Sequence, residues 1–125
     1  MANKVNFITE DGLQGIEVDG EKLFNACNHP VSVLTKTGVV KIPQAGTVIR
    51  AEVIGEDVEY FVGVKIVRPL YGDINGLPPE KPKVMYLASS PAINTLNDSR
   101  RDVIAIGETH KSEGKILVLS FRRKY

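Results

Sequence analysis

Short runs of β-forming residues, each closed by a turn of glycine, proline, asparagine or aspartate, occupy most of this chain. In residues 47–53 the side chains of Thr, Ile, Ala and Val alternate with those of Val, Arg and Glu, which is the period of a half-buried strand. Such runs predict a mainly β fold. The length of 125 residues suits one domain, residues 1–125, with its own hydrophobic core. We therefore expect a compact single-domain sandwich or barrel, with one short helix near residues 90–97.

Turn signals place several strands and one loop. Hairpins are expected around residues 10–12 and 35–38, where glycine can adopt a positive φ. Residues 58–70 form the longest β-type run, and because both of its faces are largely apolar we expect a central strand. Residues 71–83 hold three prolines and two glycines, which predicts an ordered surface loop. Residues 115–125 are expected to close the chain as a strand that is apolar on both faces.

The composition bounds the cellular setting. The single cysteine, Cys27, excludes an intramolecular disulfide and a cysteine-based metal site, and it fits a reducing cytosol. No apolar run approaches the ~18 residues that a membrane span needs, and the acidic, polar N-terminus does not resemble a signal peptide. We therefore expect a cytoplasmic protein without a membrane partner.

Charge is distributed unevenly along the chain. Residues 1–62 carry five Lys and Arg against nine Asp and Glu, a net −4, whereas residues 63–125 carry eleven against six, a net +5. The near-neutral total argues against a binder of long nucleic acids, which is usually strongly basic. The basic half leaves room for a local anion site. Opposite-sign halves also favour the docking of one subunit on another.

The stretch 86–107 is the strongest candidate for a binding site. Ser90 and Pro91 after a strand are typical of a helix start, with Ser90 as the cap. The free N–H groups of that helix and the hydroxyls of Ser89 and Ser90 favour an anion. Arg100 and Arg101 can hold phosphate oxygens in bidentate fashion. The alternative is that Ser90 only caps the helix and Arg101 only pairs with Asp102.

Other polar and aromatic side chains can complete such a site. Asn94 and Tyr86 belong to the same stretch, and Tyr71 opens the proline-rich loop, where it can stack on a nucleobase. Asn28 and His29 can offer an amide and an imidazole to a base edge or a ribose. The alternatives are that Tyr71 only fixes its own loop and that His29 belongs to a turn before proline. Most of the remaining aromatic residues fall in strand interiors and are expected in the core.

The sequence carries no recognisable catalytic pattern. It lacks the G-x-S-x-G elbow, the P-loop, G-x-G-x-x-G and H-E-x-x-H. The two histidines, His29 and His110, are far apart and have no partner cysteine at metal-ligand spacing. We therefore expect a protein that is not an enzyme and that uses no cofactor and no metal.

Four segments together resemble a small-protein family of phages and bacteria: "NHPVSVL", "IPQAGTVIRAEV", "GDINGLPPEKPKVMYLASS" and "RRDVIAIGE". The family pattern has an "HPV" strand, then "IPPSG", a "GLP-x-P" loop, a "YIVS" strand and an "R-x-D" element. This chain departs from it at Gln44 and Ala45, in place of Pro-Ser, and at Ala88, which is often Val. The resemblance spans roughly residues 28–107. It implies a phage-type protein, and such proteins include oligomeric sponges of the anti-CBASS and anti-Thoeris kind.

These features lead to one expected function and two alternatives. We expect a homo-oligomer, a dimer or a tetramer, that binds a cyclic dinucleotide second messenger of bacterial immunity and sequesters it intact. Arg100 and Arg101 would hold phosphate, Ser89, Ser90 and Asn94 would orient ribose or phosphate, and Tyr71 would stack on a base. One alternative is a structural or interaction module, such as a small phage accessory or virion-associated β-domain. The other is a hydrolase or transferase whose site forms only in the folded chain.

Overall fold

The computed structural model describes residues 4–36, 38–96 and 100–124, and in this part of the chain strands predominate. The predicted mainly β fold is confirmed, and the only helix among the described residues is the six-residue α1. The elements are β1 (Asn6–Glu10), β2 (Leu13–Val18), β3 (Glu21–Asn25), β4 (Val31–Thr35), β5 (Gly38–Ile42), β6 (Arg50–Phe61), β7 (Val64–Asn75), β8 (Val84–Ala88), α1 (Ser90–Thr95), β9 (Val103–Ile106), β10 (Thr109–Ser112), β11 (Lys115–Val118) and β12 (Phe121–Arg123).

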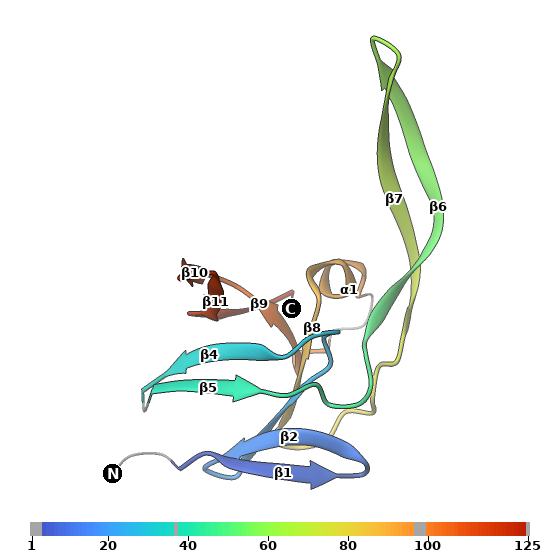
Figure 1. Ribbon diagram of the computed structural model, residues 1–125. Coiled ribbons are helices and arrows are strands. Elements are labelled where there is room, and N and C mark those ends of the chain that lie inside the picture. Colours follow the sequence, from blue (N-terminus) through green and yellow to red (C-terminus); the bar gives the residue numbers. More distant parts are fainter. Residues whose placement is uncertain (1–3, 37, 97–99, 125) are drawn as a thin grey trace.

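Two sheets form a compact body of the sandwich type (Figure 1). The larger sheet has the order β1-β2-β3-β8-β9-β12, and the smaller has the order β10-β11-β4-β5. One hydrophobic cluster joins them, because it takes side chains from β2, β3, β8 and β9 of the larger sheet and from β4, β5 and β11 of the smaller. Its buried members are Ile16, Leu23, Cys27, Val31, Val33, Ile42, Leu87, Ile104 and Val118.

The larger sheet is also covered on its other face. There α1, the segment 76–83 and the chain leading into β6 pack a second cluster against β3, β8 and β9. Its buried members are Phe24, Ala26, Ala45, Ile49, Val84, Tyr86, Ala88, Ala92, Leu96 and Val103. β8 pairs in parallel with β3 and with β9, and parallel strands covered on both faces are apolar throughout. This explains the continuous apolar run of β8 and β9.

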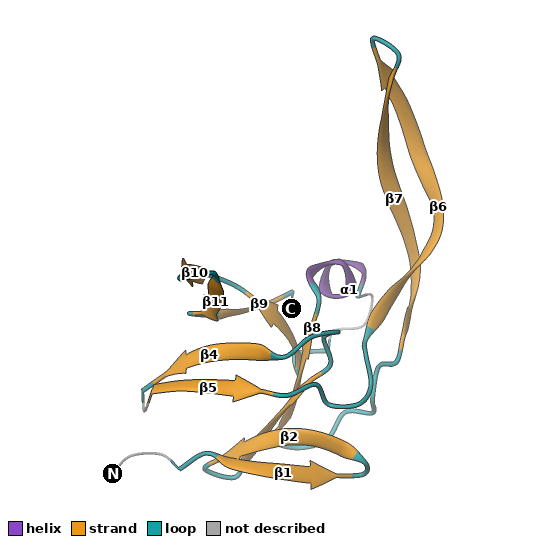
Figure 2. Cartoon of the chain, viewed as in Figure 1, coloured by secondary structure: helices purple, strands orange, loops and turns teal. Residues whose placement is uncertain are grey.

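Strands β6 and β7 form a two-stranded hairpin of their own that projects away from the body, which we call the arm (Figure 2). The prediction that residues 58–70 form a central strand is therefore wrong. Residues 62–63 are the turn of the arm, and both strands are exposed over most of their length. The loop predicted over 71–83 is also shorter, because β7 continues to Asn75.

The shorter hairpins follow their turn residues. Asp11 and Gly12, at φ 52° and 80°, join β1 to β2, as predicted, and β4 and β5 pair antiparallel as far as Thr35 and Gly38. The C-terminal segment is not a single strand. It leaves the smaller sheet after Val118 and enters the larger sheet at Phe121, so β11 and β12 belong to different layers. Among the described residues, no helix is long and apolar enough to cross a membrane.

Candidate functional site

Arg100, not Arg101, is the arginine that pairs with Asp102. Its Nε donates to Oδ1 and its Nη2 to Oδ2 of Asp102, both at 2.7 Å, and Nη2 also donates to the carbonyl oxygen of Pro78 at 2.9 Å. Glu80 lies 3.5 Å away, and the Arg100 side chain is only 16% exposed. The hydrogen bonds to Asp102 raise the pKa of Arg100. Arg100 therefore ties the segment 76–83 to the start of β9.

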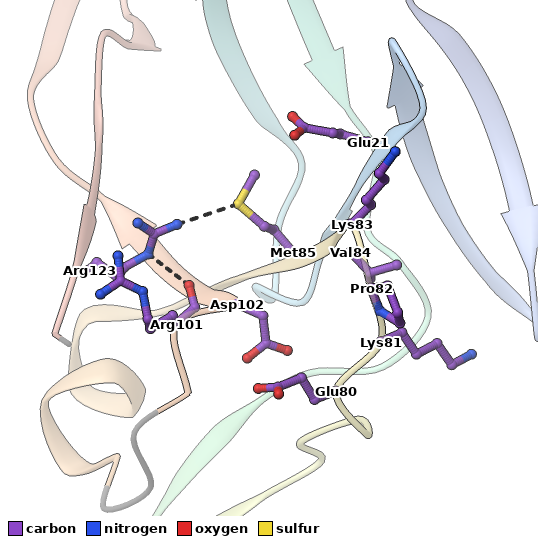
Figure 3. Close-up of a pocket in the computed structure, with 10 residues that line it drawn as sticks. All are labelled: Glu21, Glu80, Lys81, Pro82, Lys83, Val84, Met85, Arg101, Asp102 and Arg123. Carbon is purple, nitrogen blue, oxygen red and sulfur yellow. Dashed lines mark hydrogen bonds between the residues drawn. The ribbon is translucent and has the colours of Figure 1, made fainter.

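Arg101 has a different environment. It is exposed, and its carbonyl oxygen accepts a hydrogen bond from Nε of Arg123 at 2.7 Å (Figure 3). Arg101 lines a cleft of which Arg100 is not part, so the two arginines do not share a pocket. The alternative in which Arg101 pairs with Asp102 is wrong, because the guanidinium that faces that carboxylate belongs to Arg100.

The cleft beside Arg101, which we call the charged cleft, lies where β3, β8 and β9 begin, and has a volume of about 560 Å³. Its lining combines four cationic and three anionic side chains, Lys81, Lys83, Arg101 and Arg123 against Glu21, Glu80 and Asp102 (Figure 3). Lys81 is paired with Asp11, and Asp102 with Arg100. Carboxylates among the cations repel a phosphate, so this cleft is a poor anion site.

The start of α1 is capped by Ser89, not by Ser90 as predicted. Ser89 is extended, at φ −70° and ψ 159°, and its Oγ accepts a hydrogen bond from the Ala92 N–H at 3.4 Å. Ser90 is the first residue of the helix. The predicted end of the helix at residues 97–99 lies outside the described residues. Asn94 faces the C-terminal strand, where its Oδ1 accepts a hydrogen bond from Nη2 of Arg122 at 3.3 Å.

Tyr86 is buried in the core, whereas His29 lies at the surface. Tyr86 is 2% exposed, its ring stacks on Phe24 with centroids 5.9 Å apart, and its hydroxyl donates to the carbonyl oxygen of Pro79 at 3.3 Å. Burial raises its pKa. His29 is exposed, with Nδ1 2.9 Å from the carbonyl oxygen of Pro30. The fold thus uses Tyr86 as a core residue and leaves His29 at a separate surface.

A second pocket, which we call the arm-base pocket, lies where the arm leaves the body. Its volume is about 340 Å³, and it brings together Tyr71 and Ser89 from the sequence-predicted set. Asn28 also lines it, because β3 and β8 are parallel neighbours and residues that follow them meet at one edge. The sequence reasoning missed Arg50, the first residue of β6, since its position depends on where the arm leaves the sheet. The full lining is Cys27, Asn28, Val48, Ile49, Arg50, Ala51, Tyr71, Ser89 and Pro91.

Cys27 lines this pocket but is chemically quiet. Cys27 is only 3% exposed, and burial raises the pKa of its thiol from the ordinary 9.0 to about 11. The thiolate is the reactive form of cysteine, so a neutral, buried thiol is a poor nucleophile at neutral pH. Within the described part of the chain, no three His, Cys, Asp or Glu side chains lie close enough to hold a metal ion.

The arm is the largest apolar surface outside the core. Ten of its large apolar residues are exposed, and several are more than half exposed. These residues are Val53, Ile54, Val58, Tyr60, Phe61, Val62, Val64, Ile66, Val67 and Tyr71. They are spread over both faces of the hairpin, and no other described element exposes as many large apolar side chains.

Comparisons with known proteins add no relative: no family model, no curated protein and no solved structure matches this chain. The fold defines a mainly β sandwich with a projecting apolar hairpin. Function therefore has to be argued from the arm and the two pockets.

Proposed function

We propose that this protein is a non-catalytic assembly module, in which the β-sandwich body holds the arm out as a surface for protein–protein contact. The observation that carries the proposal is the exposed apolar surface of β6 and β7. A two-stranded hairpin is marginal in water by itself, and clustered exposed apolar side chains mark interaction sites in monomeric proteins. A protein partner on the arm would supply the cover that the body does not.

The turn at the tip supports the same function. Among the described residues, four turns have the same backbone, with a residue at φ 49–53° followed by a glycine at φ 77–81°. Three of them place Asp or Glu first: Asp11-Gly12, Asp19-Gly20 and Glu113-Gly114. The arm instead places Val62 there, although a β-branched residue is disfavoured at positive φ. Val62 therefore occupies an unfavourable backbone conformation, and its apolar side chain is 87% exposed. Both features are explained if that side chain contacts a partner.

The experiment compares the intact chain with an arm-shortened variant. Gly55 and Leu70 are paired across the hairpin, so residues 56–69 can be replaced by Asn-Gly, which closes such a pair with a two-residue turn. Sedimentation of extracts from the cells that make the protein should place the intact chain in a complex larger than a monomer. The shortened chain should sediment as a monomer, with the circular dichroism and melting temperature of the body retained.

A point variant tests the contribution of the arm's tip alone. Val62→Asp gives the arm the kind of turn residue found in the body hairpins, so the hairpin should fold at least as well. The complex should nevertheless weaken, because a charge replaces an apolar contact. The assembly function is wrong if the shortened chain remains in a complex as large as that of the intact chain.

A second function has support from the arm-base pocket. There a tyrosine ring, the Arg50 guanidinium, the Asn28 amide and the Ser89 hydroxyl line one concavity, which is the chemistry that a phosphorylated nucleotide requires. We retain as a candidate the sequestration of a cyclic dinucleotide without turnover. In this version Arg50 takes the role that the sequence suggested for Arg100, which is committed to Asp102.

Calorimetry with cyclic di- and trinucleotides and ADP-ribose derivatives tests this candidate. Binding should be lost in Arg50→Ala and Tyr71→Ala and kept in Arg101→Ala, the matched control, whose side chain belongs to the charged cleft. Recovery of the ligand unchanged by chromatography would separate sequestration from hydrolysis or transfer. The candidate fails if none of these ligands binds at about 100 μM.

A further inference from the structure

We propose that the occupant of the arm is a second copy of this chain, and that two arms cross antiparallel, the tip of each against the base of the other. This inference rests on the proposed assembly function and adds the identity of the partner and the geometry of the contact. It is carried by the order of charged and apolar side chains along one face of the arm.

The register of the hairpin separates its two faces. Directly paired residues lie on the same face, and successive pairs alternate between faces. One face, which we call the contact face, therefore carries three consecutive pairs: Tyr60 with Lys65 toward the tip, Val58 with Val67 in the middle, and Glu56 with Pro69 toward the base. The opposite face carries Phe61 with Val64, Glu59 with Ile66, and Asp57 with Arg68.

The contact face is complementary to itself when a copy is turned end to end. Its single cation, Lys65, and its single anion, Glu56, lie about 7 Å on either side of the central valine pair. A two-fold axis across the arm at Val58 and Val67 places Tyr60 and Lys65 of one copy in the same layer as Glu56 and Pro69 of the other. Each dimer then contains two such layers, each with opposite charges within reach.

Other arrangements of two arms are less favourable. If the arms lay tip to tip, the two Lys65 side chains would share one layer and the two Glu56 side chains another, so like charges would meet. Edge-to-edge pairing of β6 would bring together strands that each carry four carboxylates and one arginine. On the opposite face, Arg68 is already paired with Asp57, and an antiparallel crossing would bring Glu59 close to a second carboxylate.

The apolar residues follow the same symmetry. Val62, at the tip, lies four residues from Val58 and is 87% exposed. Exposed residues of the base lie at about the same distance from the central pair, on its other side. An antiparallel crossing therefore covers each tip with a base. The residues covered would expose on the order of 800 Å² per copy, about what each partner of a standard interface buries. They are Val58, Tyr60 and Val67 on the contact face, Val62 at the tip, and Val53, Ile54 and Tyr71 at the base.

Within the described residues, neither Glu56 nor Lys65 forms an ion pair in its own chain, so both are available to a partner. This allows a charge-swap experiment. Sedimentation equilibrium of the purified full chain at about 100 μM should give a dimer. Glu56→Lys and Lys65→Glu should each raise the dissociation constant about tenfold, because each places like charges together in both layers.

The decisive measurement is the equimolar mixture of these two variants. In the mixed dimer every layer again holds one lysine and one glutamate, so the affinity should return to that of the original chain. Glu59→Lys is the matched control: it has the same charge change on the same strand but on the opposite face, and it should not weaken the dimer. Circular dichroism should show the same folded body in all variants.

Several results would overturn the inference. These are a purified chain that stays monomeric at about 1 mM, a mixture that associates no better than its components, or a Glu59→Lys variant as weak as Glu56→Lys. A monomeric purified chain with an arm-dependent complex in extracts would overturn the second copy as occupant while leaving the assembly function standing. A monomer in both experiments would overturn both.

Discussion

Two runs of this chain, residues 58–67 in the arm and 84–88 in the body, are both largely apolar but have opposite surroundings. β8 is covered on both faces by its own chain, and its Leu87 and Ala88 are 0% and 1% exposed. The residues of the arm are equally rich in Val, Ile, Tyr and Phe, yet Tyr60 and Phe61 are 69% and 70% exposed. An apolar pattern on both faces predicts that a strand is covered, but not which molecule covers it.

Topology separates the two runs. β8 enters a sheet between β3 and β9 in parallel pairing, so helix and loop connections lie against its faces. The arm instead pairs only with itself, because the turn at residues 62–63 folds the run back at its middle. Val62 hides this turn from sequence reasoning, since Asn or Asp is expected before a glycine in such hairpins.

The largest contrast is expected from removing one apolar side chain in each run. Leu87→Ala leaves a cavity between the two sheets, and it should lower the free energy of unfolding by about 2–5 kcal/mol. Val64→Ala on the arm, where the side chain is 64% exposed, should change it by less than about 0.5 kcal/mol in dilute, monomeric protein. Urea denaturation followed by circular dichroism measures both. Equal losses would mean that the arm belongs to the cooperative core.

Most of the fold of the body was predictable from the sequence. The short hairpins carry polar residues before glycine, and β8 and β9 are apolar runs bounded by polar turns. The C-terminal run predicts one strand because the move from the smaller sheet to the larger occurs at Leu119 and Ser120, where no glycine or proline marks a break. The exposed arm was not predictable from the sequence. The alternation of apolar and polar residues along a strand indicates which side chains are buried, and in the arm the apolar side chains are exposed instead.

Two neighbouring arginines show the same contrast at the level of the site. Arg100→Ala removes the partner of a carboxylate whose side chain is 9% exposed, and it should cost about 1.5–3 kcal/mol of unfolding free energy. Arg101→Ala should be nearly neutral, since that side chain is exposed. Thermal unfolding of the two variants side by side checks the assignment. A larger loss in Arg101→Ala would mean that Asp102 is held by the other arginine.

The candidate site was predictable only in part. The sequence identified Tyr71 and Ser89, but it could not say that they share a pocket with Arg50, because this depends on the arm leaving the body beside the ends of β3 and β8. It also could not decide which of two adjacent arginines faces Asp102. In the fold the chain turns at residues 101–102, and it is the guanidinium of Arg100 that reaches back to the Asp102 carboxylate.

The last effect is expected from pH, and it again contrasts the body with the arm. Burial raises the pKa of Cys27 to about 11 in the folded chain, above its ordinary 9.0. The folded state therefore binds the thiol proton more tightly than the unfolded state. This contribution to stability is fully present below pH 9.0 and is lost as the pH rises toward about 11.

Cys27→Ala should remove this part of the decline in stability between those pH values, which urea titrations at several pH values would measure. All other side chains are common to the two proteins, so the difference between their stabilities isolates the thiol. A cysteine placed on the arm as Val64→Cys in the Cys27→Ala background should react quickly with a thiol reagent at pH 8, whereas native Cys27 should react slowly. Equal rates for the two cysteines would show that the body opens as readily as the exposed arm, and the contrast between the two regions would then be lost.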